Sequence, residues 1–72
     1  MLRIISLNLN GIRSAWSKNV LPWVVAQAPD IVCLQELKAA DREFPIAAIE
    51  SAGYSATWRG QRTWNGVAIL AR

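Results

Sequence analysis

The amino-acid sequence predicts an α/β fold, and three observations along its 72 residues support that class. Residues 5–10 alternate between apolar and polar side chains, which is typical of a strand with one apolar face. Residues 19–27 place their apolar side chains on one face of a helix. Residues 31–34 form a short apolar run rich in branched side chains, typical of a strand covered on both faces. Strand, helix and strand in this order predict a βαβ unit.

The first predicted strand ends in two asparagines. Asn8 and Asn10 both fall on its polar face, so their side chains point the same way. Gly11 supplies a turn directly after them, and residues 12–15 carry the chain away from this end of the strand. In the helix that follows, Asn19 is a candidate N-cap.

The second predicted strand ends at a glutamate. Glu36 follows the apolar run directly, after Gln35. The carboxyl ends of two parallel strands joined by a crossover meet at one edge of the sheet. Asn8, Asn10 and Glu36 are therefore expected to converge.

The rest of the chain predicts a second helix and a hairpin. The helix begins near Pro45, which suits a first helical position, and ends at a Gly53 C-cap. Residues 54–59 and 67–71 are predicted strands, and the loop of residues 60–66 is rich in turn formers that suit an antiparallel hairpin. The predicted sheet is therefore mixed.

Composition and length set limits on the class of protein. With 53% hydrophobic and 18% charged residues, the chain is too rich in core-forming side chains to be a disordered segment, and its length allows one domain at most. A single cysteine, Cys33, excludes a disulfide framework and is expected to be a buried thiol in a reducing compartment. No apolar run approaches the roughly 18 residues that a membrane helix needs, so we expect a cytoplasmic protein without a membrane partner. The net charge of +3 is compatible with a polyanionic partner but does not require one.

Glu36 is the first candidate for chemistry. A carboxylate at a strand end beside two amides offers oxygen ligands for a hard cation such as magnesium. Alternatively, Glu36 is a solvated residue or an ion-pair partner of Lys38. Asn10 alone is better explained as a turn residue before Gly11, whereas Asn8 lies inside the strand and is the more informative of the two asparagines.

The hairpin loop is the second candidate region. Arg59, Arg62 and Trp64 combine positive charge with an aromatic ring, a combination that can contact phosphates and stack against a sugar or base. The alternative is a hairpin tip whose arginines only keep it soluble.

Three runs taken together closely resemble the opening of the exonuclease III family of apurinic/apyrimidinic endonucleases. They are residues 6–13 (SLNLNGIR), 29–38 (PDIVCLQELK) and 65–70 (NGVAIL), and both their order and their spacing fit. The resemblance covers nearly the whole chain. It implies the amino-terminal part of a four-layered α/β sandwich, deoxyribonuclease I-like, in which two mixed sheets pack between helices. Residues 1–72 would then be a truncated segment of one such domain.

The resemblance also implies roles for individual residues. Glu36 matches a magnesium ligand, Asn8 matches a member of the active-site and metal network, and Asn10 matches a position near the metal and the DNA. Arg13 and Lys38 match basic residues near the DNA backbone and the metal site. Trp64 falls where relatives have a residue that faces the DNA, and we assign Arg62 to the same DNA surface. Leu37 stands where relatives commonly have threonine.

The implied reaction is Mg²⁺-dependent hydrolysis of a phosphodiester in double-stranded DNA with abasic sites, with Mn²⁺ as an alternative metal, combining abasic-site endonuclease and 3′–5′ exodeoxyribonuclease activities. The family's reaction also needs a histidine paired with an aspartate. The chain has no histidine, and neither Asp30 nor Asp41 matches a catalytic aspartate of the family. We therefore expect the 72-residue chain alone to be inactive. The alternatives are a non-catalytic remnant or DNA-binding module, or another phosphoesterase of the same superfamily.

Overall fold

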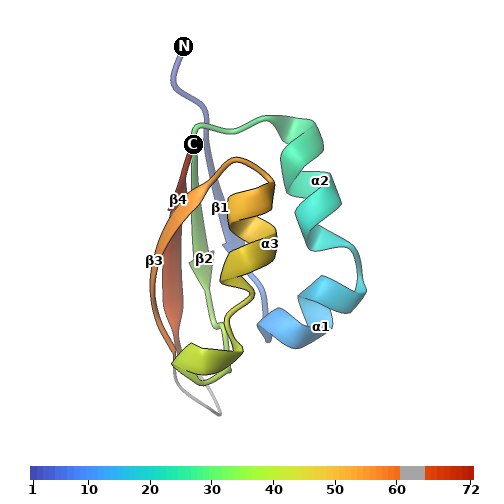
Figure 1. Cartoon of the computed structure of the whole chain (residues 1–72), viewed down its shortest axis with the longest axis vertical. Helices are drawn as coiled ribbons and strands as arrows, with labels where there is room; N and C mark the ends of the chain where they lie inside the picture. Colours follow the sequence, from blue (N-terminus) through green and yellow to red (C-terminus); the bar gives the residue numbers. More distant parts are fainter. Residues whose placement is uncertain (61–64) are drawn as a thin grey trace.

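The computed structural model describes residues 1–60 and 65–72. They form a single sheet with helices on one side of it (Figure 1). In chain order the elements are strand β1 (Ile4–Asn8), helices α1 (Ile12–Ser17) and α2 (Val20–Gln27), strand β2 (Ile31–Gln35), the 3₁₀ turn η1 (Asp41–Glu43), helix α3 (Ile46–Ser51) and strands β3 (Ser55–Arg59) and β4 (Val67–Ala71). The α/β class is confirmed.

The sheet has the order β1-β2-β4-β3. β1 and β2 are parallel, and β4 is antiparallel to both β2 and β3. The βαβ unit, the hairpin and the mixed sheet predicted from the sequence are therefore confirmed. The register aligns Asn8 with Gln35 and Gln35 with Val67, so β2 lies centrally and its carboxyl end is flanked by a neighbour on each side.

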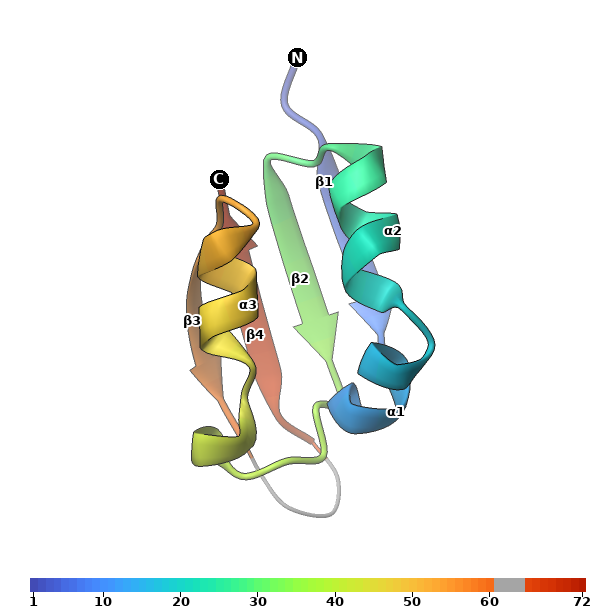
Figure 2. The same ribbon diagram turned by 45° about the vertical axis from the view of Figure 1, so that its right-hand side comes forward.

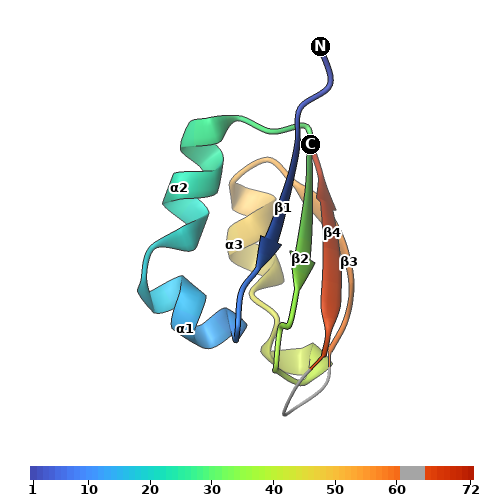
Figure 3. The same cartoon turned by 180° about the vertical axis from the view of Figure 1, so that it is seen from behind.

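All three α-helices lie on one face of the sheet, which Figures 2 and 3 show from two sides. The core lies between the sheet and these helices, where Val32, Leu34 and Leu70 from the strands pack with Ile12 and Ile49 from the helices. Each of these five side chains is at most 4% exposed. No helix within residues 1–60 and 65–72 is long and apolar enough to cross a membrane.

The opposite side of the sheet, which we call the open face, carries apolar side chains that nothing in the described residues covers. Ile4, Val67 and Ile69 are 57%, 54% and 55% exposed. β2 was expected to be covered on both faces, and within this structure that expectation is wrong, because only its alternate residues are buried. Cys33 is consequently half-buried on the open face and is not the fully buried thiol that the sequence predicted.

The segment after β1 differs from its prediction. Residues 12–15 were expected only to lead the chain away, and instead they belong to helix α1. Asn19 is not a side-chain N-cap: its φ of 64° is left-handed, whereas a capping residue is extended, and its side chain makes no capping hydrogen bond. Its backbone N–H donates to the carbonyl oxygen of Trp16 at 3.1 Å, so Asn19 serves as the bend between α1 and α2.

Helix α3 ends as predicted at a glycine. Gly53 has a φ of 93° and donates its N–H to Glu50, while the N–H of Tyr54 donates to Ile49. These two bonds form a Schellman motif, which satisfies carbonyl groups at the end of the helix. The Tyr54 hydroxyl then donates to the carbonyl oxygen of Pro29 at 2.6 Å and ties the start of β3 to the loop before β2.

Gly60, directly after β3, packs closely against the segment that leads into η1. Its N–H donates to Asp41 Oδ1 at 2.5 Å, and a Cβ at this position would lie 2.2 Å from the Ala39 carbonyl oxygen. Gly60→Ala is therefore expected to lower the free energy of unfolding by about 1–3 kcal/mol, the usual cost of overpacking. Urea denaturation measures this, with Ser55→Ala on the exposed side of β3 as the control. An unchanged unfolding midpoint for Gly60→Ala would show that the backbone of residues 39–41 can move away from the added methyl group at little cost in free energy.

Candidate functional site

The carboxyl ends of β1 and β2 lie side by side, and the backbone pairing continues beyond both strands. The N–H of Leu9 donates to the Gln35 carbonyl at 2.9 Å, and the N–H of Gly11 donates to the Glu36 carbonyl at 2.8 Å. The turn that follows β1 is therefore attached directly to the segment that carries Glu36. This attachment brings the predicted site residues of the two strands together.

Four side chains at this edge form a closed set of polar contacts, which we call the polar ring. Asn8 Nδ2 donates to Glu36 Oε2. Glu36 Oε1 lies 3.9 Å from Lys38 Nζ, and Lys38 Nζ donates to Asn10 Oδ1 at 2.5 Å. The Asn10 backbone N–H donates to Asn8 Oδ1 at 3.1 Å and closes the ring. The predicted convergence of Asn8, Asn10 and Glu36 is confirmed, and Lys38 joins them.

The ring fixes the orientation of the Asn8 amide. Because the Asn10 backbone N–H can only donate, the Asn8 atom that receives it must be the oxygen, and the Asn8 NH₂ group therefore faces Glu36. Asn8 thus orients the carboxylate through a charge-assisted hydrogen bond. Its role as a direct metal ligand stays a prediction.

Glu36 is open enough to bind a cation. Its side chain is 40% exposed, and the neighbouring Lys38 side chain is 31% exposed. At a separation of 3.9 Å and with this exposure, the ion pair with Lys38 is weak. The one carboxylate of the ring suits magnesium, which commonly binds one or two protein carboxylates and fills its remaining positions with water and substrate phosphate.

The other predicted DNA-contacting residues lie in different places. Arg13 is in α1, where its side chain is 80% exposed and its guanidinium lies 3.6 Å from a Glu43 carboxylate oxygen. Arg62 and Trp64 lie outside the described residues. The end of their loop adjoins the polar ring, because the Lys38 backbone N–H donates to the Asn65 carbonyl oxygen at 3.1 Å.

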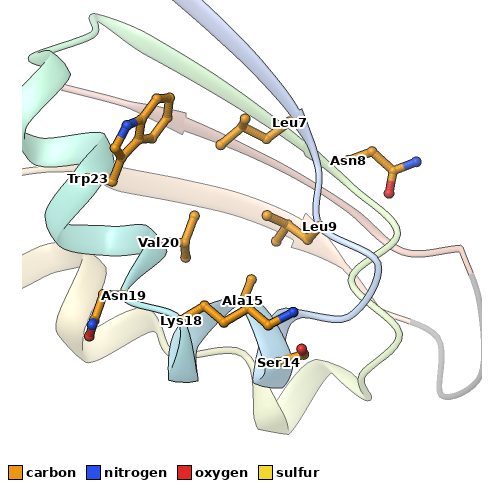
Figure 4. Close-up of a pocket in the computed structure, with 9 residues that line it drawn as sticks. All are labelled: Leu7, Asn8, Leu9, Ser14, Ala15, Lys18, Asn19, Val20 and Trp23. Carbon is orange, nitrogen blue, oxygen red and sulfur yellow. The ribbon is translucent and has the colours of Figure 1, made fainter.

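Two hollows flank this edge of the sheet. An open cavity of about 420 Å³ lies between β1 and helices α1 and α2 and is lined mainly by apolar side chains such as Leu7, Val20 and Trp23 (Figure 4). Asn8 lies at the rim of this cavity, and its amide points away from the apolar side chains that line it. A second hollow, on the other side of Glu36, is lined by Glu36 and Arg59 among others. The lining of this second hollow thus includes one acidic and one basic side chain, and the hollow adjoins the candidate site.

Sequence reasoning missed several groups around the ring. Gln35 Nε2 donates to Ser6 Oγ at 3.1 Å, and these two side chains precede the ring residues on their respective strands. The polar alternation in β1 was the signal for Ser6. The Leu37 N–H donates to the Gly66 carbonyl oxygen at 3.1 Å, a backbone contact that had no signal in the sequence.

The ring does not contain a full set of catalytic groups. Within residues 1–60 and 65–72, no three His, Cys, Asp or Glu side chains gather as a metal cluster, and the whole sequence lacks histidine. Glu36 and Lys38 place a carboxylate and an ammonium group side by side, and such groups commonly contact cations and phosphate oxygens respectively. If Glu36 binds a cation, the ring has no second carboxylate and no histidine to take a proton from water.

Comparison with known proteins identifies the family. The Endonuclease/Exonuclease/phosphatase family pattern matches residues 5–72. The chain belongs to this family. The family match includes every residue of the polar ring. The fold of this chain is accordingly the amino-terminal part of the deoxyribonuclease I-like α/β sandwich.

Three similar proteins of this family show the extent of the match. Exodeoxyribonuclease III of Haemophilus influenzae is 37% identical over 71 residues, which cover 99% of this chain and 26% of that protein. The structure of an AP endonuclease from Archaeoglobus fulgidus has a TM-score of 0.88 and 42% identity, over 99% of this chain and 27% of its own. The structure of a 3′ phosphatase from Neisseria bound to product DNA hairpin has a TM-score of 0.86 and 36% identity, over 100% of this chain and 28% of its own. The endonuclease/exonuclease/phosphatase chain described here thus spans about a quarter of the length of these relatives.

Proposed function

We propose that this chain supplies the metal-binding edge of a DNA-repair phosphodiesterase with abasic-site endonuclease and 3′–5′ exodeoxyribonuclease activities. The observation that carries the proposal is the polar ring, in which Asn8 directs the Glu36 carboxylate at a sheet edge. The names of the similar proteins support the same reaction class, since they describe an exodeoxyribonuclease, an AP endonuclease and a 3′ phosphatase. All three descriptions refer to phosphoester chemistry at DNA.

In this proposal each ring residue has a defined task. Glu36 supplies a carboxylate oxygen to Mg²⁺ or Mn²⁺, and Asn8 fixes the orientation of that carboxylate through its NH₂ group. The bound cation would polarise the scissile phosphate and offset its charge. Lys38, steadied by Asn10, places a positive charge 3.9 Å from the carboxylate, where a phosphate oxygen of the DNA can approach. Metal and ammonium together would hold the phosphate.

The substrate we propose is double-stranded DNA with abasic sites. Arg13, with its 80% exposed side chain, would contact the DNA backbone, as would the predicted DNA residues Arg62 and Trp64. The net charge of +3 supports binding to a polyanion. We also propose a cytoplasmic location.

The reaction needs groups beyond those of the ring. Water must lose a proton as it attacks the phosphate, and the leaving oxygen must be stabilised. With one carboxylate in the ring and no histidine in the sequence, the 72-residue chain by itself is proposed to be inactive. The missing groups would come from segments like those that make up the remaining three quarters of the relatives.

A chimera tests the proposal. Residues 1–72 replace the matching 71-residue segment of the Haemophilus influenzae exodeoxyribonuclease III, and a second chimera uses the Archaeoglobus fulgidus AP endonuclease in the same way. Each chimera is expected to nick a duplex with one abasic site in the presence of Mg²⁺, whereas the isolated 72-residue chain is expected to nick none. Gel analysis of a labelled duplex measures both.

The outcomes separate the alternatives. Cooperatively folded chimeras that bind the duplex without cleaving it would favour a non-catalytic DNA-binding module. Folded chimeras that release phosphate from small phosphoesters, and leave abasic DNA intact, would favour another phosphoesterase of the superfamily. Nicking by the isolated chain would contradict the proposed dependence on further catalytic groups.

A further inference from the structure

Leu37 lies between two residues with unusual backbone conformations. Glu36 has a φ of 55° and Lys38 a φ of 52°, both in the left-handed region. Neither residue is of a type that adopts this region readily, unlike glycine or asparagine. Such conformations persist only where the surrounding structure holds them, and they are concentrated at functional sites. Contacts with neighbouring segments must therefore hold residues 36–38 in place.

The two peptide groups on either side of Leu37 are each hydrogen-bonded in both directions. In the first, the Glu36 carbonyl accepts from Gly11 at 2.8 Å and the Leu37 N–H donates to Gly66 at 3.1 Å. In the second, the Leu37 carbonyl accepts from Ile12 at 2.8 Å and the Lys38 N–H donates to Asn65 at 3.1 Å. Each peptide plane is thus attached on one side to the turn after β1 and on the other to the segment before β4.

The Leu37 side chain provides the remaining attachment. It is 1% exposed and belongs to the hydrophobic core, whereas the side chains of Glu36 and Lys38 on either side of it are partly exposed. Both neighbours reach the same polar ring, because Lys38 Nζ lies 3.9 Å from Glu36 Oε1. Leu37 thus enters the core, while the two side chains that flank it come together outside it.

From this arrangement we infer that Leu37 is a positioning residue for Glu36. Its burial anchors the doubly bonded peptides, and these set the direction in which the Glu36 carboxylate leaves the backbone. Loss of the anchor would allow the segment to relax toward ordinary backbone angles and would turn the carboxylate away from Asn8. The inference rests on the proposed function, because it assumes that Glu36 binds the divalent cation.

The test measures binding of Mn²⁺ alone, without DNA, to the folded Haemophilus chimera. Leu37→Ala is expected to raise the dissociation constant about 10-fold, the lower end of the effect of removing a group that orients a metal ligand. Electron paramagnetic resonance of free Mn²⁺ gives the constant. Leu37→Met, which retains an apolar side chain of similar volume, is expected to restore binding to within about twofold.

Leu70→Ala is the matched control. Leu70 is 2% exposed in the same core but pairs with Val32 and Ala56, away from the polar ring. Leu70→Ala should lower the stability as Leu37→Ala does, while leaving the dissociation constant for Mn²⁺ unchanged. The positioning role would be overturned if Leu37→Ala and the parent chimera had the same dissociation constant. It would also be overturned if both alanine variants weakened Mn²⁺ binding equally. Leu37→Val, a smaller truncation, replaces Leu37→Ala if the latter does not fold, and it is judged by the same comparison with Leu70→Ala.

The parent chimera separates failure of the proposed function from failure of the positioning role. If it neither binds Mn²⁺ nor cleaves DNA, the proposed function fails and the positioning role fails with it. If it does both and Leu37→Ala binds Mn²⁺ normally, only the role of Leu37 is refuted.

Discussion

Replacing Glu36 with glutamine in the chimera is expected to lower Mg²⁺-dependent cleavage of abasic DNA at least about 100-fold, more than the loss of an orienting group typically costs. Glu36 is the one carboxylate of the polar ring, so the substitution removes the negative charge that the cation needs while keeping the size and planarity of the side chain. The rate is measured at saturating DNA over a series of Mg²⁺ concentrations.

Two further variants establish that the effect belongs to the site. Glu50→Gln removes the same charge from the exposed surface of α3 and should leave the rate unchanged. Asn8→Ala removes the donor to Glu36 but not the carboxylate, and a smaller loss of about 10-fold is expected. Cleavage by Glu36→Gln within a few fold of the parent would show that the metal is held elsewhere and would remove the basis of the proposed function.

The strands and the meeting of their ends were predictable because each depends on a local pattern. Alternation marked β1, a continuous apolar run marked β2, and the rule that parallel strands end at one edge brought Asn8 and Glu36 together. Lys38 was named as a neighbour of Glu36 from its spacing alone, and the structure places it 3.9 Å from the carboxylate.

What the sequence did not reveal depends on distant backbone contacts. The left-handed conformations of Glu36 and Lys38 occur where backbone hydrogen bonds from segments 25 to 29 residues away meet the buried Leu37, and neither residue type signals them. The bend at Asn19 was missed for a related reason, since asparagine suits both an N-cap and a left-handed bend and only the presence of α1 decides between them. The half-buried state of Cys33 likewise depends on what lies over the open face.

The open face leads to the second large expected effect. In a four-layered sandwich, two sheets lie face to face between outer helices, so we expect the face of the sheet opposite α1, α2 and α3 to meet the second sheet. Ile69 lies near the middle of this face, paired with Cys33 and Thr57, and it is 55% exposed in this chain. In the chimera, where the relative supplies the other layers, Ile69→Asp is expected to cost about 3–5 kcal/mol of unfolding free energy, as an uncompensated buried charge does.

Urea denaturation of the chimera measures this cost, and Ala48→Asp on the exposed side of α3 is the control. The control introduces the same charge on the outer helical layer and should change the free energy of unfolding by only about 0.5 kcal/mol. An equally small effect for both variants would mean that water reaches Ile69 in the complete domain. The open face would then not meet a second sheet, and the exposed Ile4 and Val67 would need another explanation. A large effect at Ile69 alone would instead explain why this side of the sheet is apolar, because those side chains would form half of a core that this chain does not complete by itself.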